Sequence, residues 1–470
     1  MRIHKSAPAL ALLVAIGTTA AVVPAAAPAA AAPGASSAAV WSVPAALERA
    51  AHPLRTAEPQ GSLGDLRPLG RMTGDAEVVG LGEATHGSHD FFALKHRVFR
   101  YLVEEQGFRT FALETGWSGG LRLNDYVLHG RGNLQQIMDE EFQNTYAVWN
   151  NAEYRGLLQW MRAYNIEHPG DPVQFMGDDN AFAGPELYDR VNAYAAATHP
   201  AQAPRIAELY RELRPTTDAD TYITAYLARP LAERKALAER SAEALGLLEQ
   251  QPSGRPVADG DDAYTWAVQH ATAIDQMTKL FAYDYDDPQG VAAGMRYRDS
   301  VMAENVLWWQ RKTGDKVLLS AHNGHVTLRS YTPDTHPKSQ GSFLRDALGG
   351  RYVSIGTTFD RGSFNATGDD GTVRPFTLGP AEPGSTEATM DRVHYRDYLV
   401  DLRNVGPAGR GWLTTPHPTR SIGSAYSDPA GAQAQLALAE SYDLAIHLHE
   451  VAAARLRTPA QDRSATRPGF

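Results

Sequence analysis

Seven short runs of strand-forming residues recur along this 470-residue chain and constrain its fold more than any other feature. Most of them are separated by stretches whose apolar residues repeat with the period of a helix. Strands that alternate with helices are typical of a largely parallel sheet covered by helices. The sequence therefore predicts an α/β fold with a largely parallel sheet flanked by helices. The predicted strands are Glu77–Gly82, Thr110–Glu114, Val173–Gly177, Lys316–Ala321, Tyr352–Phe359, Tyr398–Leu402 and Leu444–Leu448.

One long interval interrupts this alternation. From about residue 185 to 311 the apolar patterns have helical period, and no convincing strand occurs. We expect an all-helical insertion in one α/β domain that spans residues 41–455; a separate helical domain is the alternative. A polar tail, residues 456–470, follows.

The first residues have the three parts of a secretory signal peptide. Arg2 and Lys5 precede the apolar stretch ALALLVAIGTTAAVV, and the small-residue segment PAAAPAAAAPG follows it. We predict cleavage near Ala32, removal of residues 1–32 and a secreted product without stable membrane association. An uncleaved membrane anchor is the alternative, although the apolar stretch is short for a bilayer. The chain has no cysteine, which excludes disulfides and lipid attachment at cysteine.

Charge argues against one class of partner. The formal net charge is -10, and acidic and basic residues are interspersed without a long run of one sign. Nucleic-acid-binding proteins usually present a basic face. We therefore expect no nucleic acid and look instead for a small-molecule substrate.

Acids and imidazoles follow four consecutive predicted strands. Ligands of open parallel sheets bind beyond the carboxyl ends of the strands, so these side chains are candidates for a site. Asp178 and Asp179 also suit a turn or a helix cap, and His89 and Asp90 suit local capping. The candidates are Glu83, His86, Glu114, Asp178, Asp179, His322 and His325.

The first of these turns, GLGEATHG, is not a phosphate cradle. The dinucleotide-binding fingerprint needs a third glycine three residues after the second. Here Gly82 is followed by Glu83, and the next glycine is Gly87. A carboxylate after Gly82 would also repel a pyrophosphate. The turn therefore carries Glu83 and His86 for another purpose.

Three motifs together, GLGEATHGSHDFF, FALETGW and LLSAHNGHV, closely resemble the erythromycin esterase family. The resemblance runs in order from about Trp41 to Glu450. It implies an α/β core with a helical insertion and hydrolysis of a macrolide lactone or a related ester by an activated water. Macrolide resistance is the role it suggests.

The same resemblance assigns candidate residues. Glu83 and His86 match the signature pair, and Glu114 matches the acid that ends the second strand. His322 and His325 match the later histidines. The catalytic arginine of the family has no exact match on the first helix, where Lys95 stands near its place and Arg97 lies half a turn on.

These residues suggest an esterase mechanism without cofactor or metal. Histidine titrates near neutral pH, so His86 would take a proton from the attacking water. Glu83 or Glu114 would fix its tautomer, and backbone amides with His322 or Arg97 would stabilise the oxyanion. We expect Arg97, Lys95, His325, Trp117 and Tyr146 to bind substrate, and Trp149 and Tyr154 are further candidates for the walls of the cleft.

Other functions stay open. The pentapeptide GWSGG fits a nucleophile elbow, with Ser118 as the nucleophile of a serine hydrolase. Glu83, His86, Glu114 and His322 would also suit a divalent ion. Finally, the chain could catalyse a proton-transfer cyclisation or ring opening, or sequester a natural product without reaction. The mass of the product separates these functions.

Overall fold

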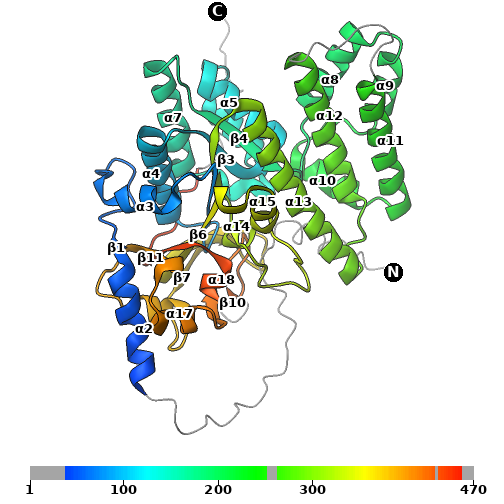
Figure 1. The fold of residues 1–470 in the computed structure, drawn as a ribbon. Helices are drawn as coiled ribbons and strands as arrows, with labels where there is room; N and C mark the ends of the chain where they lie inside the picture. Colours follow the sequence, from blue (N-terminus) through cyan, green and yellow to red (C-terminus); the bar gives the residue numbers. More distant parts are fainter. Residues whose placement is uncertain (1–36, 251–261, 429–431, 458–470) are drawn as a thin grey trace, which may run out of the picture.

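The computed structural model describes residues 37–250, 262–428 and 432–457 (Figure 1). Its centre is a mixed sheet with the strand order β1-β8-β11-β6-β2-β5-β3-β4, and β7 pairs with β6. The strands from β11 to β4 run parallel, whereas β1, β7 and β8 make antiparallel pairs. The expected α/β fold with a largely parallel sheet is confirmed. Residues 1–32 and most of the expected tail lie outside the described residues.

All seven predicted strands occur, several with other ends. They are β2 (Val78–Leu81), β3 (Phe108–Gly116), β4 (Gln174–Asp179), β5 (Lys316–Ser320), β6 (Tyr352–Thr367), β8 (Tyr398–Asp401) and β11 (Leu444–Val451). The sequence did not predict β1 (Ala51–Pro53), β7 (Val373–Leu378) or the separate hairpin of β9 (His417–Arg420) and β10 (Gln433–Leu436).

The side chains of the central strands pack into two apolar cores. Val78 of β2 and Ala112 of β3 contribute to one core, while Val79 and Phe111, one residue away in each strand, contribute to the other. Side chains of a strand alternate between its faces, so the sheet separates the two cores. Helix α4 (His89–Gln106) and α7 (Ala152–Glu167) belong to one core, and α2 (Ser37–Ala50), α13 (Pro288–Thr313) and α15 (Gln340–Leu348) belong to the other.

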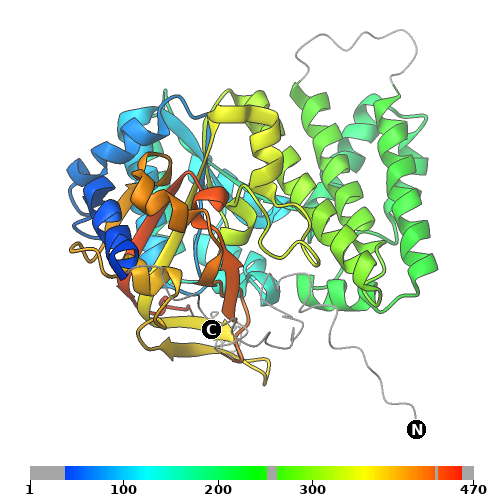
Figure 2. The same ribbon diagram turned by 60° about the horizontal axis from the view of Figure 1, so that its bottom comes forward.

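Helices alone connect β4 to β5 in the described part of the chain. They are α8 (Pro185–Thr198), α9 (Ala203–Tyr210), α10 (Ala219–Leu227), α11 (Leu231–Glu249), α12 (Asp262–Phe281) and α13. Figures 1 and 2 show the green helices of this group standing beside the sheet. α13 contacts both β4 and α15, so it links the helical group to the end of the sheet where β4 ends.

No helix among the described residues combines the length and the apolar character needed to cross a membrane.

Candidate active site

Four predicted residues meet at one edge of the sheet. Strands β2, β5 and β3 are adjacent and parallel, so their carboxyl ends lie side by side. β2 leads into the turn with Glu83 and His86, β3 carries Glu114, and β5 leads to His322. Each of these residues is at most 4% exposed. The structure therefore brings all four together in a buried cluster.

The turn that carries His86 presses against β6. A Cβ atom on Gly87 would lie 1.9 Å from the carbonyl oxygen of Asn365, so only glycine fits there. The backbone of Gly87 accepts hydrogen bonds from the amides of Asn365 and Ala454. The turn is thus fixed by neighbours on both sides.

Glu83 links His86 to Lys95. His86 Nδ1 lies 2.8 Å from Glu83 Oε1, and Lys95 Nζ donates to Glu83 Oε2 at 2.5 Å and to the carbonyl of Ala321 at 3.1 Å. Burial lowers the pKa of Lys95, and the charge of Glu83 opposes this effect. With a proton on Nδ1 shared with Glu83, the lone pair of His86 is on Nε2, which makes no hydrogen bond to the described residues.

Glu114 contacts other partners than His86. Its Oε2 accepts from the amide of His322 at 3.0 Å, and its Oε1 lies 3.1 Å from His325 Nε2 and 3.2 Å from Arg298 Nη2. Burial acts to raise the pKa of Glu114, but the charge and hydrogen bond of His325, with help from His86 and Arg298, lower it well below the ordinary value. Glu114 is therefore a carboxylate that positions the later histidines.

His322 and His325 have opposite charge states. Burial lowers the pKa of His322 well below its usual value, and a positive charge on the nearby His86 would lower it further, so His322 is neutral. Its Nδ1 accepts from the amide of Gly324 at 3.1 Å, and its Nε2 lies 3.2 Å from the carbonyl of Ile422. Burial opposes the charge of His325, but Asp299 and Glu114 raise its pKa to about 10, so it is protonated.

Arg298 of α13 completes the cluster, and sequence reasoning missed it. The buried guanidinium donates to Asp179 from Nε at 3.0 Å and from Nη2 at 2.6 Å. Tyr146 donates its hydroxyl to the same carboxylate at 2.9 Å. One pattern in the sequence could have indicated Arg298. It is the pair of opposite charges, Arg298 and Asp299, among the buried residues of a long helix. Asp179, weighed as a turn residue, is a partner of this arginine.

Comparison with known proteins identifies the chain. A family model described as erythromycin esterase matches residues 103–451. The chain belongs to the erythromycin esterase family. The matched range contains Glu114, His322 and His325 and begins after Glu83 and His86. This membership supports a hydrolase.

The relatives of this erythromycin esterase family member have low sequence identity, but they match it over most of its length. The chain is 25% identical to erythromycin esterase type II of Escherichia coli, over 75% of this chain and 87% of that protein. A crystal structure of a Bacillus cereus protein is 30% identical, with a TM-score of 0.81 over 89% of this chain and 99% of that one. A histidine-to-asparagine variant of erythromycin esterase EreC, in its open conformation, has a TM-score of 0.65 at 18% identity, over 84% and 96% of the two chains. That last likeness concerns the fold.

Two of the residues expected to bind substrate, Arg97 and Trp117, lie away from this cluster. Arg97 donates to the carbonyl of Thr56 at 2.9 Å and pairs with Asp65, because α4 turns it away from the face that carries Lys95. The ring of Trp117 packs 5.6 Å from that of Trp308 in the core beside the helical insertion. The structure supports neither as a substrate contact, and Lys95 is the cation beside Glu83.

Other aromatic candidates lie at the cluster. The ring centroid of Trp149 is 4.9 Å from that of His86 at 79°, and its indole N–H donates to the carbonyl of Glu114 at 2.9 Å. The hydroxyl oxygen of Tyr154 lies 3.0 Å from Oγ of Ser320. Trp149 therefore covers one side of the imidazole of His86.

Ser118 lacks the surroundings of a nucleophile. Its hydroxyl accepts from the amide of Gly184 at 2.9 Å, and in the described part of the chain it makes no hydrogen bond to a histidine. The glycines of GWSGG have a packing role, because a Cβ on Gly120 would lie 2.0 Å from the amide nitrogen of Gly177. They let α5 (Trp117–His129) approach β4 closely.

The four-residue metal set does not converge on one ion. Lys95 already pairs with Glu83, and both ring nitrogens of His322 meet backbone groups. Among the described residues, the groups whose donor atoms do converge are Asp299, His325 and His336, and Asp360, Asp391 and His449.

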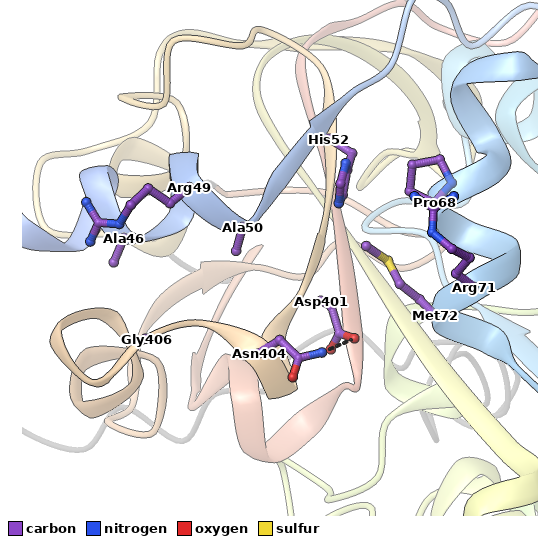
Figure 3. Close-up of a pocket in the computed structure, with 10 residues that line it drawn as sticks. All are labelled: Ala46, Arg49, Ala50, His52, Pro68, Arg71, Met72, Asp401, Asn404 and Gly406. Carbon is purple, nitrogen blue, oxygen red and sulfur yellow. Dashed lines mark hydrogen bonds between the residues drawn. The ribbon is translucent and has the colours of Figure 1, made fainter.

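The cluster is closed in this structure. A cavity of about 560 Å³ lies elsewhere, between α2, α3 (Arg67–Thr73) and β8 (Figure 3). Its residue Asp401 pairs with Leu444, the first residue of β11, so this cavity lies at the amino ends of the parallel strands. Substrate therefore needs a displacement of covering residues to reach His86.

Proposed function

We propose that this chain hydrolyses a carboxylic ester or macrolactone, with His86 Nε2 as the general base that activates water. The observation that carries the proposal is the 2.8 Å contact of His86 Nδ1 with Glu83, together with an Nε2 that has no hydrogen bond to the described residues. An acid that holds one nitrogen of an imidazole leaves the other nitrogen to accept a proton.

The steps follow from these groups. Water loses a proton to His86 Nε2 and attacks the carbonyl carbon, and Glu83 stabilises the resulting imidazolium. The imidazolium then gives its proton to the leaving alkoxide, which opens the ester. The neutral ring of His322, whose centroid is 4.9 Å from that of His86, is the proposed donor to the oxyanion. It would exchange the carbonyl of Ile422 for the substrate oxygen.

Macrolactones are the first substrate class to test, since the Escherichia coli relative is named an erythromycin esterase. Purified protein is incubated with macrolactones and simple esters, and product masses are measured. Hydrolysis adds one water to the substrate. An isomer of unchanged mass would instead support the cyclase or ring-opening alternative, and tight binding without product would support sequestration.

The proposed steps need no metal ion, because base, acid partner and oxyanion donor are side chains of the chain itself. Folded enzyme stripped of metal is expected to keep most of its kcat. Loss of kcat in enzyme that is still folded, with recovery on addition of a divalent ion, would contradict this mechanism.

We also propose export with removal of roughly the first thirty residues, on the basis of the basic start and the alanine- and proline-rich segment. Amino-terminal sequencing of protein from the culture medium tests this. A membrane-bound product that retains Met1 would overturn it.

A further inference from the structure

A second buried cluster lies behind Glu114, on the far side of His325. His325 Nε2 faces Glu114, and its Nδ1 lies 3.0 Å from Asp299 Oδ1 and 3.1 Å from Oδ2. His336 Nε2 approaches Asp299 Oδ2 to 2.8 Å. All three residues are at most 4% exposed. Two imidazoles thus converge on one carboxylate in the interior.

The contacts within this cluster leave polar atoms unsatisfied. Among the described residues, Asp299 Oδ1 and His336 Nε2 have no hydrogen-bond partner, because the angles of their ion-pair contacts are poor. Gln340 donates to Asp299 and to Asp178, yet Gln340 Oε1 and Asp178 Oδ1 also lack a partner in this part of the chain. Buried polar atoms without partners are rare, so several in one neighbourhood point to a ligand that they share.

The donor set fits a transition-metal ion. Donor atoms of Asp299, His325 and His336 all lie within 4.8 Å of one another. Tetrahedral ligands at about 2.0–2.1 Å from zinc are about 3.3 Å apart, so small side-chain shifts would complete the site. Imidazole with carboxylate is a ligand set that zinc and its neighbours in the first transition row accept. Metal-bound histidines usually donate their second N–H to a carboxylate, as His325 can to Glu114.

We propose that Asp299, His325 and His336 form a structural site for one divalent transition-metal ion of the zinc type. The ion would be bound by His325 Nδ1, from which it would displace a proton to solvent, by His336 Nε2 and by a carboxylate oxygen of Asp299. It would join α13 to the segment between α14 (Asn323–Val326) and α15, and so brace His325 against Glu114. The ion takes no part in the proposed hydrolysis, so a test of this metal site does not depend on whether the proposed hydrolysis is correct.

Metal content tests the site directly. Tag-free protein is incubated with zinc, and unbound metal is removed by gel filtration. Mass spectrometry then gives the amount of zinc per chain, and the Tm is measured with and without zinc. One equivalent and a raised Tm are expected for the wild-type protein. His336→Gln should bind no zinc and show no shift in Tm.

Two matched variants make the assignment specific. His449→Gln alters the other convergent group and should keep its zinc. His336→Cys replaces one ligand by a thiolate, so its cobalt form should gain a thiolate-to-cobalt charge-transfer band; the chain has no other cysteine that could cause it.

Three results would overturn the proposal: wild-type protein without zinc, loss of zinc in His449→Gln with retention in His336→Gln, or a cobalt form of His336→Cys without the band. If His336→Gln does not fold, the cobalt spectrum of His336→Cys decides.

Discussion

At the residue scale, the histidines of the site differ because their neighbours differ. His322 is neutral, since burial lowers its pKa, whereas Asp299 and Glu114 hold His325 protonated with a pKa of about 10. His86 combines an acid partner on Nδ1 with an Nε2 that makes no hydrogen bond within the described part of the chain. One imidazole can therefore act as base while another donates a hydrogen bond.

Removal of the proposed base should affect the chemical step. His86→Ala is expected to lower kcat by about a hundred- to ten-thousand-fold, because a positioned base contributes about that much. Glu83→Gln should also lower kcat, since it removes the charge that stabilises the imidazolium. Single-turnover kinetics on the best substrate of the panel measure both. Near wild-type rates for His86→Ala would rule out this base.

Glu114→Gln should reduce stability as well as rate. The variant removes one of the two carboxylates that face each of His325 and Arg298, and breaking a buried ion pair from one side costs up to about 3–5 kcal/mol. Urea unfolding gives the loss of stability, and kcat is compared well below the transition. A stable variant with kcat as low as that of His86→Ala would instead return the orienting role to Glu114.

Ser118→Ala separates stability from catalysis. The variant removes the acceptor for the buried amide of Gly184, which should cost about 1–3 kcal/mol of unfolding free energy. Its kcat should be close to that of the wild type, and a serine-directed inhibitor should leave no adduct. An acyl group on Ser118 in the intact mass would contradict the proposed mechanism.

The residues of the site could be predicted from the sequence only where they directly follow a strand of the sheet. Glu83, His86, Glu114 and His322 each follow a strand, and parallel strands bring their ends together. Arg298 comes from a helix more than 180 residues after Glu114 in the chain, and no local pattern indicates that α13 would reach this edge. Arg97 was expected at the site because the family resemblance calls for a cation on this helix; it lies half a turn from Lys95 and pairs with Asp65 instead.

At the element scale, prediction succeeded for the buried parallel strands and failed at the edges. β2 and β5 are continuous apolar runs, the pattern of strands covered on both faces. β7 alternates between partly buried and exposed residues beside β6, and β1 has three residues. Short or half-exposed strands lack an apolar run, so their pairing depends on neighbours that the sequence does not reveal.

Close packing of α5 on β4 offers a test at this scale. Gly120→Ala would place a methyl group 2.0 Å from the nitrogen of Gly177 and should destabilise by about 1–3 kcal/mol, as overpacking does. Gly246→Ala in α11 is the matched control, because nothing lies within 4 Å of the added Cβ. The control should be neutral or stabilising by up to about 1 kcal/mol. Chemical denaturation of both variants measures the difference, and equal effects would refute the packing role.

At the scale of the whole molecule, His89 joins three segments. Its Nδ1 lies 2.7 Å from Glu153 of α7, and its Nε2 lies 2.8 Å from Glu58 in the loop before α3. The hydrogen bond to Glu153, opposed by burial and helped by Glu58, raises the pKa of His89 to about 9. The charged imidazole therefore holds α4 against α7 and this loop at neutral pH.

This contact should weaken in alkali. Because the folded pKa is above the unfolded value of 6.5, its contribution is complete below pH 6.5 and disappears as pH rises through about 9. The difference in unfolding free energy between wild type and His89→Gln should shrink across that window, by less than about 1.4 kcal/mol per pH unit because the exposed Glu58 is screened. Urea unfolding at several pH values measures it. A difference that is constant from pH 6 to 10 would contradict the charge state.

The turn that carries His86 is held by residues that are synthesised long after the turn itself. Ala452 accepts from the amide of His89, and Ala454 donates to the carbonyl of Gly87, more than 360 residues earlier in the chain. At about 5–20 residues per second, a ribosome needs roughly twenty to seventy seconds to bridge that interval. Throughout this time the nascent chain has His86 and Glu83 but lacks the backbone contacts that fix their turn. The turn can therefore reach its final geometry only after more than 360 further residues have been synthesised, whatever the speed at which its own strand and helix form.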